Sequence, residues 1–310
     1  MRGIKSLNDI PTPPDNCAVA IGNFDGVHLG HRKILSFLLR EAKNDGLYPL
    51  LVTFHPHPAK VLTERKIELL QTIEQRLNEI HKFGIRMTVV LSFDKSFALT
   101  TAKDFIRTIL IQKLQAKKVI VGENFQFGKN REGDVSKLQE LASLYGFSVL
   151  SVSPVSIGDS VVSSSLIRRL LHSGKIEKAN KLLGRPYEIE GTVVRGKSRG
   201  RRLGFPTANI HSMNDIAPPG VFISEVEIGS KIFPSVTHVG SKPTFGEKDV
   251  VIESYIIDYQ NNLYKKKLRV RFLKKIREEM IFDTPESLSR QIKKDLDKTL
   301  AFFQKKKSSF

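Results

Sequence analysis

Residues 17 to 153 alternate between two patterns that few folds accommodate together. Strand-length apolar runs, separated by longer stretches of helical periodicity, occur at 17–21, 48–54, 87–93, 119–122 and 147–152. One helical stretch places Ile73, Leu77 and Ile80 on a single face. This alternation predicts an α/β fold, a doubly wound parallel sheet with helices on both faces. Ligands of such sheets bind at the carboxyl ends of the strands.

The pattern changes after residue 163. Two short helices are predicted at 165–172 and 176–183, the second ending at Gly184 with Pro186 just beyond. Short segments rich in Val, Ile, Phe and Tyr follow, separated by Gly and Pro, at 190–194, 221–228, 232–239, 251–259 and 268–273. That spacing predicts a small all-β domain, a barrel or a sandwich, of which we favour the barrel.

A C-terminal helix is expected from Asp283 or Thr284, immediately before Pro285. Its apolar residues recur at steps of four, at Leu288, Ile292, Leu296 and Leu300. A chain of 310 residues with 40% apolar content is long enough for two cores. We therefore predict two domains, residues 1–183 and residues 184–310.

Composition also indicates where in the cell the protein is expected. Cys17 is the single cysteine, so neither an intrachain disulfide nor a thiolate metal site can form, which suits a reducing cytosol. No stretch stays apolar for the roughly 20 residues of a spanning helix. We expect a cytoplasmic protein with no membrane partner.

The formal charge of +18 can be interpreted in three ways. Clustered Lys and Arg are typical of nucleic-acid binding, but the basic run at 265–277 alternates with Leu268, Val270 and Phe272 and also fits a solvated strand face. A positive field would equally favour an anionic small substrate such as ATP. A basic RNA-binding protein therefore stays open as an alternative.

A glycine-rich segment follows the first strand and leads directly into the first helix. It runs Gly22-Asn23-Phe24-Asp25-Gly26-Val27-His28-Leu29-Gly30-His31. Its glycines allow close backbone approach, and the helix N-terminus attracts phosphate oxygens. His28 and His31 are three apart, so both rings can project from one face of the first turn and stabilise charge on a phosphoryl group. Surface or core filling is the alternative for this histidine pair.

Hydroxyl side chains precede a second helix at Ser163, Ser164 and Ser165, and Arg168 follows one turn after Ser164. The hydroxyls could bind phosphate or merely cap the helix, and Arg168 could grip a leaving pyrophosphate through charge-assisted hydrogen bonds.

The C-terminal half contains no Walker-type phosphate loop, but it has a basic loop that includes Gly196, Gly200 and Arg201. Such a loop can wrap phosphates. Pro206-Thr207-Ala208-Asn209 follows, and on an extended chain Thr207 and Asn209 would point the same way and offer two oxygen ligands to Mg²⁺. A simple turn is the alternative. Glu253 lies in an apolar strand, where it is either a proton-abstracting base or a solvated, outward-facing carboxylate.

The glycine-rich segment that contains His28 and His31, together with the serine segment before Arg168, resembles the nucleotidyltransferase superfamily. Two further segments, Thr53-Phe54-His55-Pro56-His57-Pro58 and Val121-Gly122-Glu123-Asn124-Phe125-Gln126-Phe127-Gly128, narrow the resemblance to the FAD synthetase module of bacterial bifunctional riboflavin kinase/FAD synthetases. The segments around Thr207 and Glu253 resemble the riboflavin kinase module of the same family. The chain departs from the family pattern at His55, Ser165 and Tyr255, where an acidic residue, Thr and His are more common.

This resemblance implies that riboflavin is phosphorylated to FMN and that FMN is then adenylylated to FAD, with ATP as co-substrate, Mg²⁺ as cofactor and no other prosthetic group. For adenylylation it implies that His28, His31 and Arg168 are catalytic. For ATP binding it implies Gly22, Asn23, Phe24, Ser164, Gly196, Arg201, Thr207 and Asn209, the last two also holding Mg²⁺. For the flavin it implies Asn124, Phe125 and Phe127, although alternating aromatic residues after a strand also fill cores.

For the kinase step the resemblance implies that Glu253 deprotonates the ribityl hydroxyl. The partners expected are riboflavin, FMN and ATP, without nucleic acid. An enzyme that retains only one of the two activities is the nearest alternative.

Overall fold

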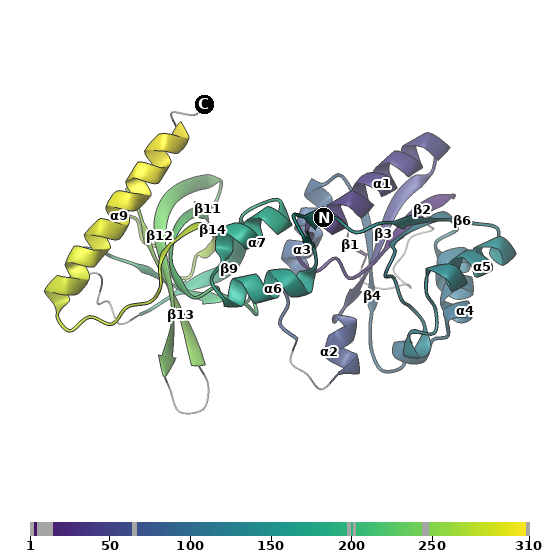
Figure 1. Ribbon diagram of the computed structural model, residues 1–310, viewed down its shortest axis with the longest axis horizontal. Helices are drawn as coiled ribbons and strands as arrows, with labels where there is room; N and C mark the ends of the chain where they lie inside the picture. The colour runs from purple at the N-terminus through teal and green to yellow at the C-terminus, as the bar shows by residue number, and fades with distance from the viewer. Residues whose placement is uncertain are drawn as a thin grey trace. The chain divides into compact units, whose positions relative to one another are not determined.

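The computed structural model describes residues 3–4, 15–63, 67–196, 200, 203–243 and 248–307, and its elements are labelled in Figure 1. The chain divides into two compact units, Met1–Ser164 and Ser165–Phe310. The helices before residue 184 thus group with the second unit. The division of functions at residues 183 and 184 stays a prediction.

The first unit is built on a six-stranded parallel sheet of order β1-β4-β3-β2-β5-β6. Its strands are β1 (Gly3–Ile4), β2 (Cys17–Ile21), β3 (Tyr48–His55), β4 (Met87–Ser92), β5 (Ala116–Gly122) and β6 (Ser148–Val152). The chain passes from β2 outward to β4 and then returns to the other side of β2 with β5. Because strand order reverses there, the carboxyl end of β2 opens into the crevice where such sheets bind ligands.

Helices cover both faces of this sheet, as predicted. One apolar cluster joins the sheet to α1 (Leu29–Asp45) and α3 (Ile73–Lys82), and a second joins its other face to the π-helix η3 (Phe105–Lys113) and to α5 (Val135–Tyr145). The remaining elements are α2 (Pro58–Leu62), η2 (Phe97–Leu99), α4 (Ala102–Asp104), η4 (Lys129–Arg131) and the hairpin of β7 (Ser156–Ile157) and β8 (Ser160–Val161).

The buried face of α3 differs from the apolar face that the sequence indicated. The spacing placed Ile73, Leu77 and Ile80 on one face, but Ile73 and Leu77 are only partly buried. The helix instead buries Ile80 with Gln75, Arg76 and Glu79. Periodicity of apolar residues missed this face because the side chains that it buries are mostly polar.

The second unit is a closed antiparallel barrel of order β10-β13-β12-β11-β14-β9 (Figure 1). Its strands are β9 (Tyr187–Val194), β10 (Ala208–Ser212), β11 (Gly220–Ile228), β12 (Lys231–Pro243), β13 (Lys248–Ile256) and β14 (Lys267–Arg277). The sequence did not predict β10, which is short and carries Asn209, His211 and Ser212 among its five residues. The predicted barrel architecture is confirmed.

Polar groups also occupy the barrel interior. Ser224, Ser235, Thr237 and Ser254 are fully buried, and their hydroxyl oxygens form a chain with 2.7 Å between neighbours. Because each hydroxyl has a hydrogen-bond partner, this polar layer avoids most of the cost of burying unsatisfied groups.

Three helices accompany the barrel: α6 (Ser164–His172), α7 (Ile176–Leu183) and α9 (Pro285–Lys307). α7 packs on β9 and β14, and the side chain of Asn180 ties them together. Its Nδ2 donates to the Phe272 carbonyl at 2.8 Å, and its Oδ1 accepts from the Tyr187 amide at 2.7 Å. The contacts of α7 are therefore those of the barrel unit.

Candidate active sites

The glycine-rich segment forms a tight turn at the carboxyl end of β2. The Gly22 amide donates to the Val52 carbonyl at 3.1 Å, which ties the turn to β3. Three residues of the turn have left-handed backbone, Phe24 at φ 51°, Gly26 at φ 87° and Val27 at φ 40°. Such values are unfavourable for Phe and Val and persist only where surrounding contacts impose them. The Phe24 ring itself is fully buried.

His28 and His31 lie together at the N-terminus of α1. His28 is the N-cap residue, and its Nδ1 accepts from the His31 amide at 3.3 Å. The two rings stack with centroids 3.7 Å apart and 16° between their planes. Gly30 makes room for this arrangement, since a Cβ there would lie 3.2 Å from the His28 ring. With Nδ1 accepting, a neutral His28 carries its proton on Nε2, where it can donate to an anion.

Ser164 connects the serine segment before α6 with the glycine-rich turn. Its hydroxyl donates to the Asp25 carbonyl at 2.8 Å, a contact between residues 139 apart in the chain. Asp25 is buried, and both oxygens of its carboxylate accept from the Leu70 amide at 3.0 and 3.2 Å. Arg168 lies one turn after Ser164 on α6, in the second compact unit. Its predicted contact with pyrophosphate stays a prediction.

The residues expected to contact flavin in the first unit follow β5. Asn124 is exposed at the carboxyl end of that strand, which neighbours β2. Phe127 is 8% exposed and belongs to the core of the sheet. Phe125 is partly buried and stacks on Phe127 with centroids 5.4 Å apart. Flavin contact by these three residues stays a prediction, and for Phe127 the core position accounts for the side chain on its own.

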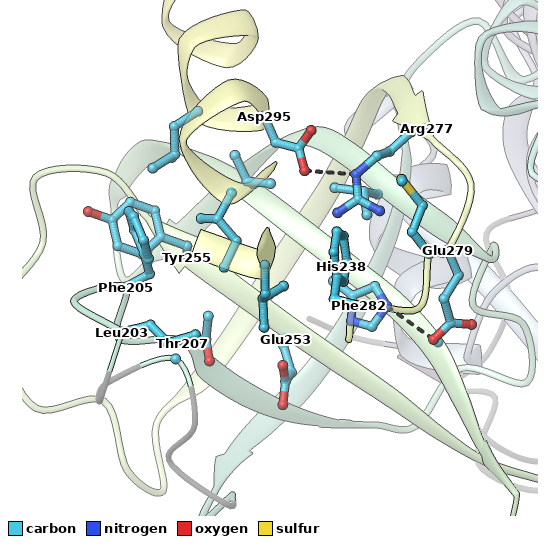
Figure 2. A pocket seen from close by; sticks show the side chains of 18 of the residues that line it. Leu203, Phe205, Thr207, His238, Glu253, Tyr255, Arg277, Glu279, Phe282 and Asp295 are labelled. Carbon is cyan, nitrogen blue, oxygen red and sulfur yellow. Dashed lines mark hydrogen bonds and ion pairs between the residues drawn. The ribbon is translucent and has the colours of Figure 1, made fainter. Parts of the chain in front are cut away.

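In the barrel, three strands place Asn209, Glu253 and His238 in one row. Glu253 of β13 is paired in register with Asn209 of β10 on one side and with His238 of β12 on the other. Directly paired residues of antiparallel strands share a face, so the three side chains project together. His238 contacts Glu279, with 3.4 Å between Nε2 and Oε1 (Figure 2). His238 was not predicted as a site residue, because no motif surrounds it in the sequence.

Two cavities meet at this row. One of about 430 Å³ lies between the outer face of the barrel and α9, and its lining includes Phe205, Glu253 and Tyr255 (Figure 2). The other, of about 810 Å³, is lined by more polar residues that include Asn209, Asp258 and Asn262. Thr207 and Tyr255 line both cavities. A ligand in one cavity would thus adjoin a ligand in the other.

The glycines of the basic loop lie against the predicted metal ligands. A side chain at Gly196 would overlap the Asn209 amide, and a Cβ at Gly200 would lie 3.3 Å from the Thr207 hydroxyl. Backbone can therefore approach both polar groups closely. Arg201, predicted to bind ATP, lies outside the described residues.

α9 forms one wall of the smaller cavity through Leu288, Ile292 and Leu296. The fourth residue of the predicted apolar stripe, Leu300, is 44% exposed, whereas Asp295 and Thr299 are buried. Asp295 accepts from Arg277 Nε at 2.9 Å and from Gln291 Nε2 at 2.8 Å. The stripe at steps of four therefore lines a cavity, and a polar contact attaches the helix to β14.

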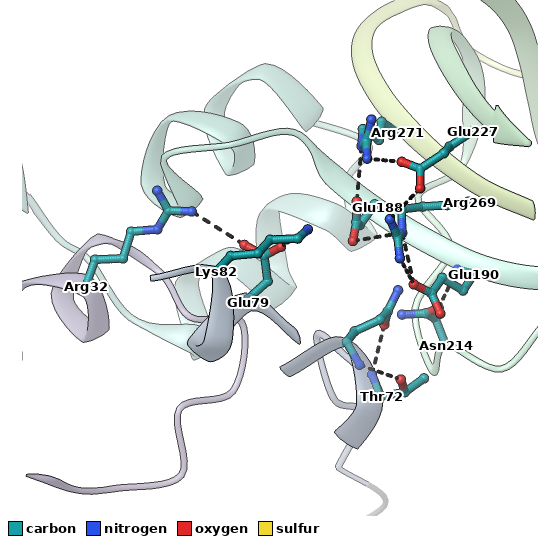
Figure 3. Close-up of polar contacts among 11 residues, drawn as sticks. Arg32, Thr72, Glu79, Lys82, Glu188, Glu190, Asn214, Glu227, Arg269 and Arg271 are labelled. Atoms are coloured by element: carbon teal, nitrogen blue, oxygen red, sulfur yellow. Dashed lines mark hydrogen bonds and ion pairs between the residues drawn. The ribbon is translucent and has the colours of Figure 1, made fainter. Parts of the chain in front are cut away.

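The three arginines of the basic run at 265–277 contact carboxylates. Leu268, Val270 and Phe272 point into the barrel and are buried, while Arg269 and Arg271 lie on its outer side (Figure 3). Arg269 contacts Glu190 at 2.7 Å and Glu227 at 2.9 Å, and Arg271 contacts Glu188 and Glu227. Carboxylates thus neutralise the charge of these two arginines. This weakens the interpretation of the run as a nucleic-acid-binding segment.

Neither a metal-binding cluster nor a membrane-spanning helix occurs among the described residues. No group of three or more His, Cys, Asp or Glu side chains is placed to hold a metal ion there. No helix in that part of the chain combines the length and the apolar character that crossing a membrane requires.

Comparison with known proteins agrees with both halves of the chain. Residues 10–166 match the FAD synthetase family and residues 183–303 match the riboflavin kinase family. Bifunctional riboflavin kinase/FMN adenylyltransferases from Buchnera aphidicola (subsp. Schizaphis graminum) and Bacillus subtilis are 37% and 35% identical to the chain. The alignments cover 98% of both chains for the first relative and 92% for the second.

A solved structure described as a macrolide-efflux protein from Streptococcus pneumoniae superimposes with a TM-score of 0.88 and 29% identity, covering 96% of this chain and 99% of that one. Its likeness extends to both units. The two family matches and the near full-length relatives show that the chain belongs to the family of bifunctional riboflavin kinases/FMN adenylyltransferases.

Proposed function

We propose that the chain phosphorylates riboflavin to FMN and then transfers AMP from ATP to FMN, releasing FAD and pyrophosphate. The observation that carries the proposal is the row of Asn209, Glu253 and His238 where two cavities meet in the barrel. The family matches to both halves support two separate activities.

For the kinase step, the smaller cavity suits the flavin. It has aromatic and aliphatic walls from Phe205, Tyr255 and α9, and its volume of about 430 Å³ lies in the usual range for small-molecule sites. The larger, more polar cavity suits ATP. Glu253 would then accept the proton of the ribityl hydroxyl as its oxygen bonds to the γ-phosphorus, and ADP would leave.

The residues beside Glu253 fit a magnesium ion that arrives with ATP. Thr207 and Asn209 offer neutral oxygen atoms, and Mg²⁺ commonly combines few protein ligands with substrate phosphates and water. Asn209 is also the in-register neighbour of Glu253. When bound, the ion would neutralise charge on the phosphate oxygens during transfer.

For the adenylylation step, a phosphate oxygen of FMN would attack the α-phosphorus of ATP while the bond to pyrophosphate breaks. The turn from Gly22 to Asp25 and the N-terminus of α1 would receive the ATP phosphates. His28 and His31 would donate to the developing charge, and Ser164 and Arg168 would hold the departing pyrophosphate. Ser164 supports this assignment, because its bond to the Asp25 carbonyl places it beside the turn.

The test is to incubate the full chain with riboflavin, ATP and Mg²⁺ and to separate FMN and FAD by chromatography. Glu253→Gln should lower FMN formation by about 10²–10⁴-fold while FAD formation from supplied FMN stays normal. His28→Ala should lower FAD formation from supplied FMN while FMN formation from riboflavin stays normal. Each variant is therefore the control for the other. If Glu253→Gln kept full kinase activity, the base assignment would be wrong. If the unaltered chain formed FMN but no FAD, only one activity would be present.

A further inference from the structure

Arg76 is a large side chain buried inside the first unit. It lies on the polar face of α3 and is 1% exposed. Its Nη1 donates to the Asn23 carbonyl at 2.5 Å and contacts the Thr53 hydroxyl at 3.3 Å. The Thr53 hydroxyl donates to the same Asn23 carbonyl at 3.1 Å. One carbonyl of the glycine-rich turn therefore accepts from two buried donors on different elements.

These contacts stabilise the segment that carries the strained backbone. Phe24, directly after Asn23, and Val27 both have positive φ, which the surrounding structure must impose. Arg76 and Thr53 hold Asn23, at one end of this segment, while the Leu70 amide and the Ser164 hydroxyl hold Asp25, two residues later. The turn is thus held on both sides of Phe24.

A buried arginine is a costly way to supply one hydrogen bond. Burial lowers the pKa of Arg76, and the charge of Asp25 only partly opposes this effect. Within the described part of the chain, its Nε and Nη2 have no hydrogen-bond acceptor. Taking a guanidinium out of water costs several kcal/mol, so one hydrogen bond to a carbonyl does not by itself explain an arginine at this position.

We propose that Arg76 is a positioning residue for adenylyl transfer, which holds the carbonyl of Asn23 so that the Gly22–Asp25 turn keeps the shape that receives the ATP phosphates. The proposal rests on the proposed function of this turn. Arg76 acts through the backbone of Asn23, and it acts on the adenylylation step alone, because the kinase residues lie on the barrel.

The experiment compares Arg76→Met and Arg76→Lys with the unaltered full chain, measuring kcat and KM for FAD formation from FMN and ATP. Displacement of catalytic groups by about 1 Å can cost about 10²-fold in rate, so Arg76→Met should lower kcat by roughly 10- to 100-fold. Arg76→Lys, which keeps a cationic donor, should restore much of that loss. Kinase activity and the midpoint of thermal unfolding should stay close to those of the unaltered chain in both variants.

Thr72→Ala is the matched control. It removes one of the two hydrogen bonds of the capping box of α3, the bond that the Thr72 hydroxyl accepts from the Gln75 amide, and keeps the bond from the backbone amide of residue 72 to the Gln75 side chain (Figure 3). This change weakens the helix that carries Arg76 but leaves the contact with Asn23. FAD formation should therefore stay near normal in folded Thr72→Ala protein. An equal loss in Thr72→Ala and Arg76→Met would assign the effect to helix stability and overturn the proposal.

Thr53→Val keeps the test decisive if Arg76→Met fails to fold. It removes the other donor to Asn23 with little change of shape, and it should lower kcat several-fold on the same reasoning. Unchanged kcat in folded Arg76→Met, or in Thr53→Val where Arg76→Met does not fold, would refute the role of Arg76 and leave the proposed function standing. No FAD from the unaltered chain would instead refute the proposed function, and the Arg76 proposal with it.

Discussion

Replacing Asp295 by leucine should loosen α9 from the barrel and remove one wall of the 430 Å³ cavity. Asp295 is 2% exposed and accepts from Arg277 on β14, which is 15% exposed. α9 also supplies Leu288, Ile292 and Leu296 to the cavity lining. If this cavity binds riboflavin, the attachment of the helix determines how well the site is formed.

The size of the effect follows from the burial of the pair. Removing one partner of a buried ion pair costs about 3–5 kcal/mol, and the low end applies here because Arg277 keeps some contact with water. Burying leucine offsets about 1 kcal/mol of that loss. The net loss of about 2 kcal/mol should lower the unfolding midpoint of the barrel unit by roughly 4–8 °C.

Two measurements check this expectation, the thermal unfolding midpoint and the KM for riboflavin in FMN formation. In Asp295→Leu the midpoint should fall and the KM for riboflavin should rise, while FAD formation from FMN stays normal. Glu225→Gln is the matched control, because it breaks an exposed contact of the same helix, with Lys306 at 3.0 Å, and should cost less than about 1 kcal/mol. Asp295→Leu protein with an unchanged midpoint and an unchanged riboflavin KM would refute the reasoning.

Three further predictions concern the rest of the chain. Burial raises the pKa of Cys17 to about 11, so a thiol reagent should label it only on unfolding. The unfolded thiol ionises first as the pH rises from about 9 to 11, so stability should fall by roughly 2–3 kcal/mol over that window, a slope that Cys17→Ala should remove in urea unfolding. A fragment of residues 173–310 should fold and phosphorylate riboflavin, whereas one of residues 183–310 should melt several degrees lower because it lacks the Asn180 contacts, as differential scanning would show. Partial burial, and then the charge of Arg76, lowers the pKa of His55, so Arg76→Met should raise that pKa in an NMR titration.

Local patterns were enough to predict most of the elements. The strand at 17–21 and the helix at 176–183 were predicted with the bounds that the structure has. These patterns work because apolar spacing reports which side of an element meets the core. The same rule failed for α3, where Arg76 and Gln75 are buried, and for β10, where a strand carries Asn209 and His211.

The sequence by itself determined the two-part architecture and the chemical types present at each site. Histidines at a helix start, a carboxylate in a strand and a Thr-Ala-Asn segment are visible as short motifs, because their chemistry depends on residue type and near spacing. The pairing of residues far apart in the chain is not visible in this way. Only the tertiary structure joined Ser164 to Asp25, aligned Glu253 with both Asn209 and His238, and buried Arg76 under Asn23. Strand register and barrel closure decide these contacts, since the whole chain must satisfy its hydrogen bonds and bury its cores at once.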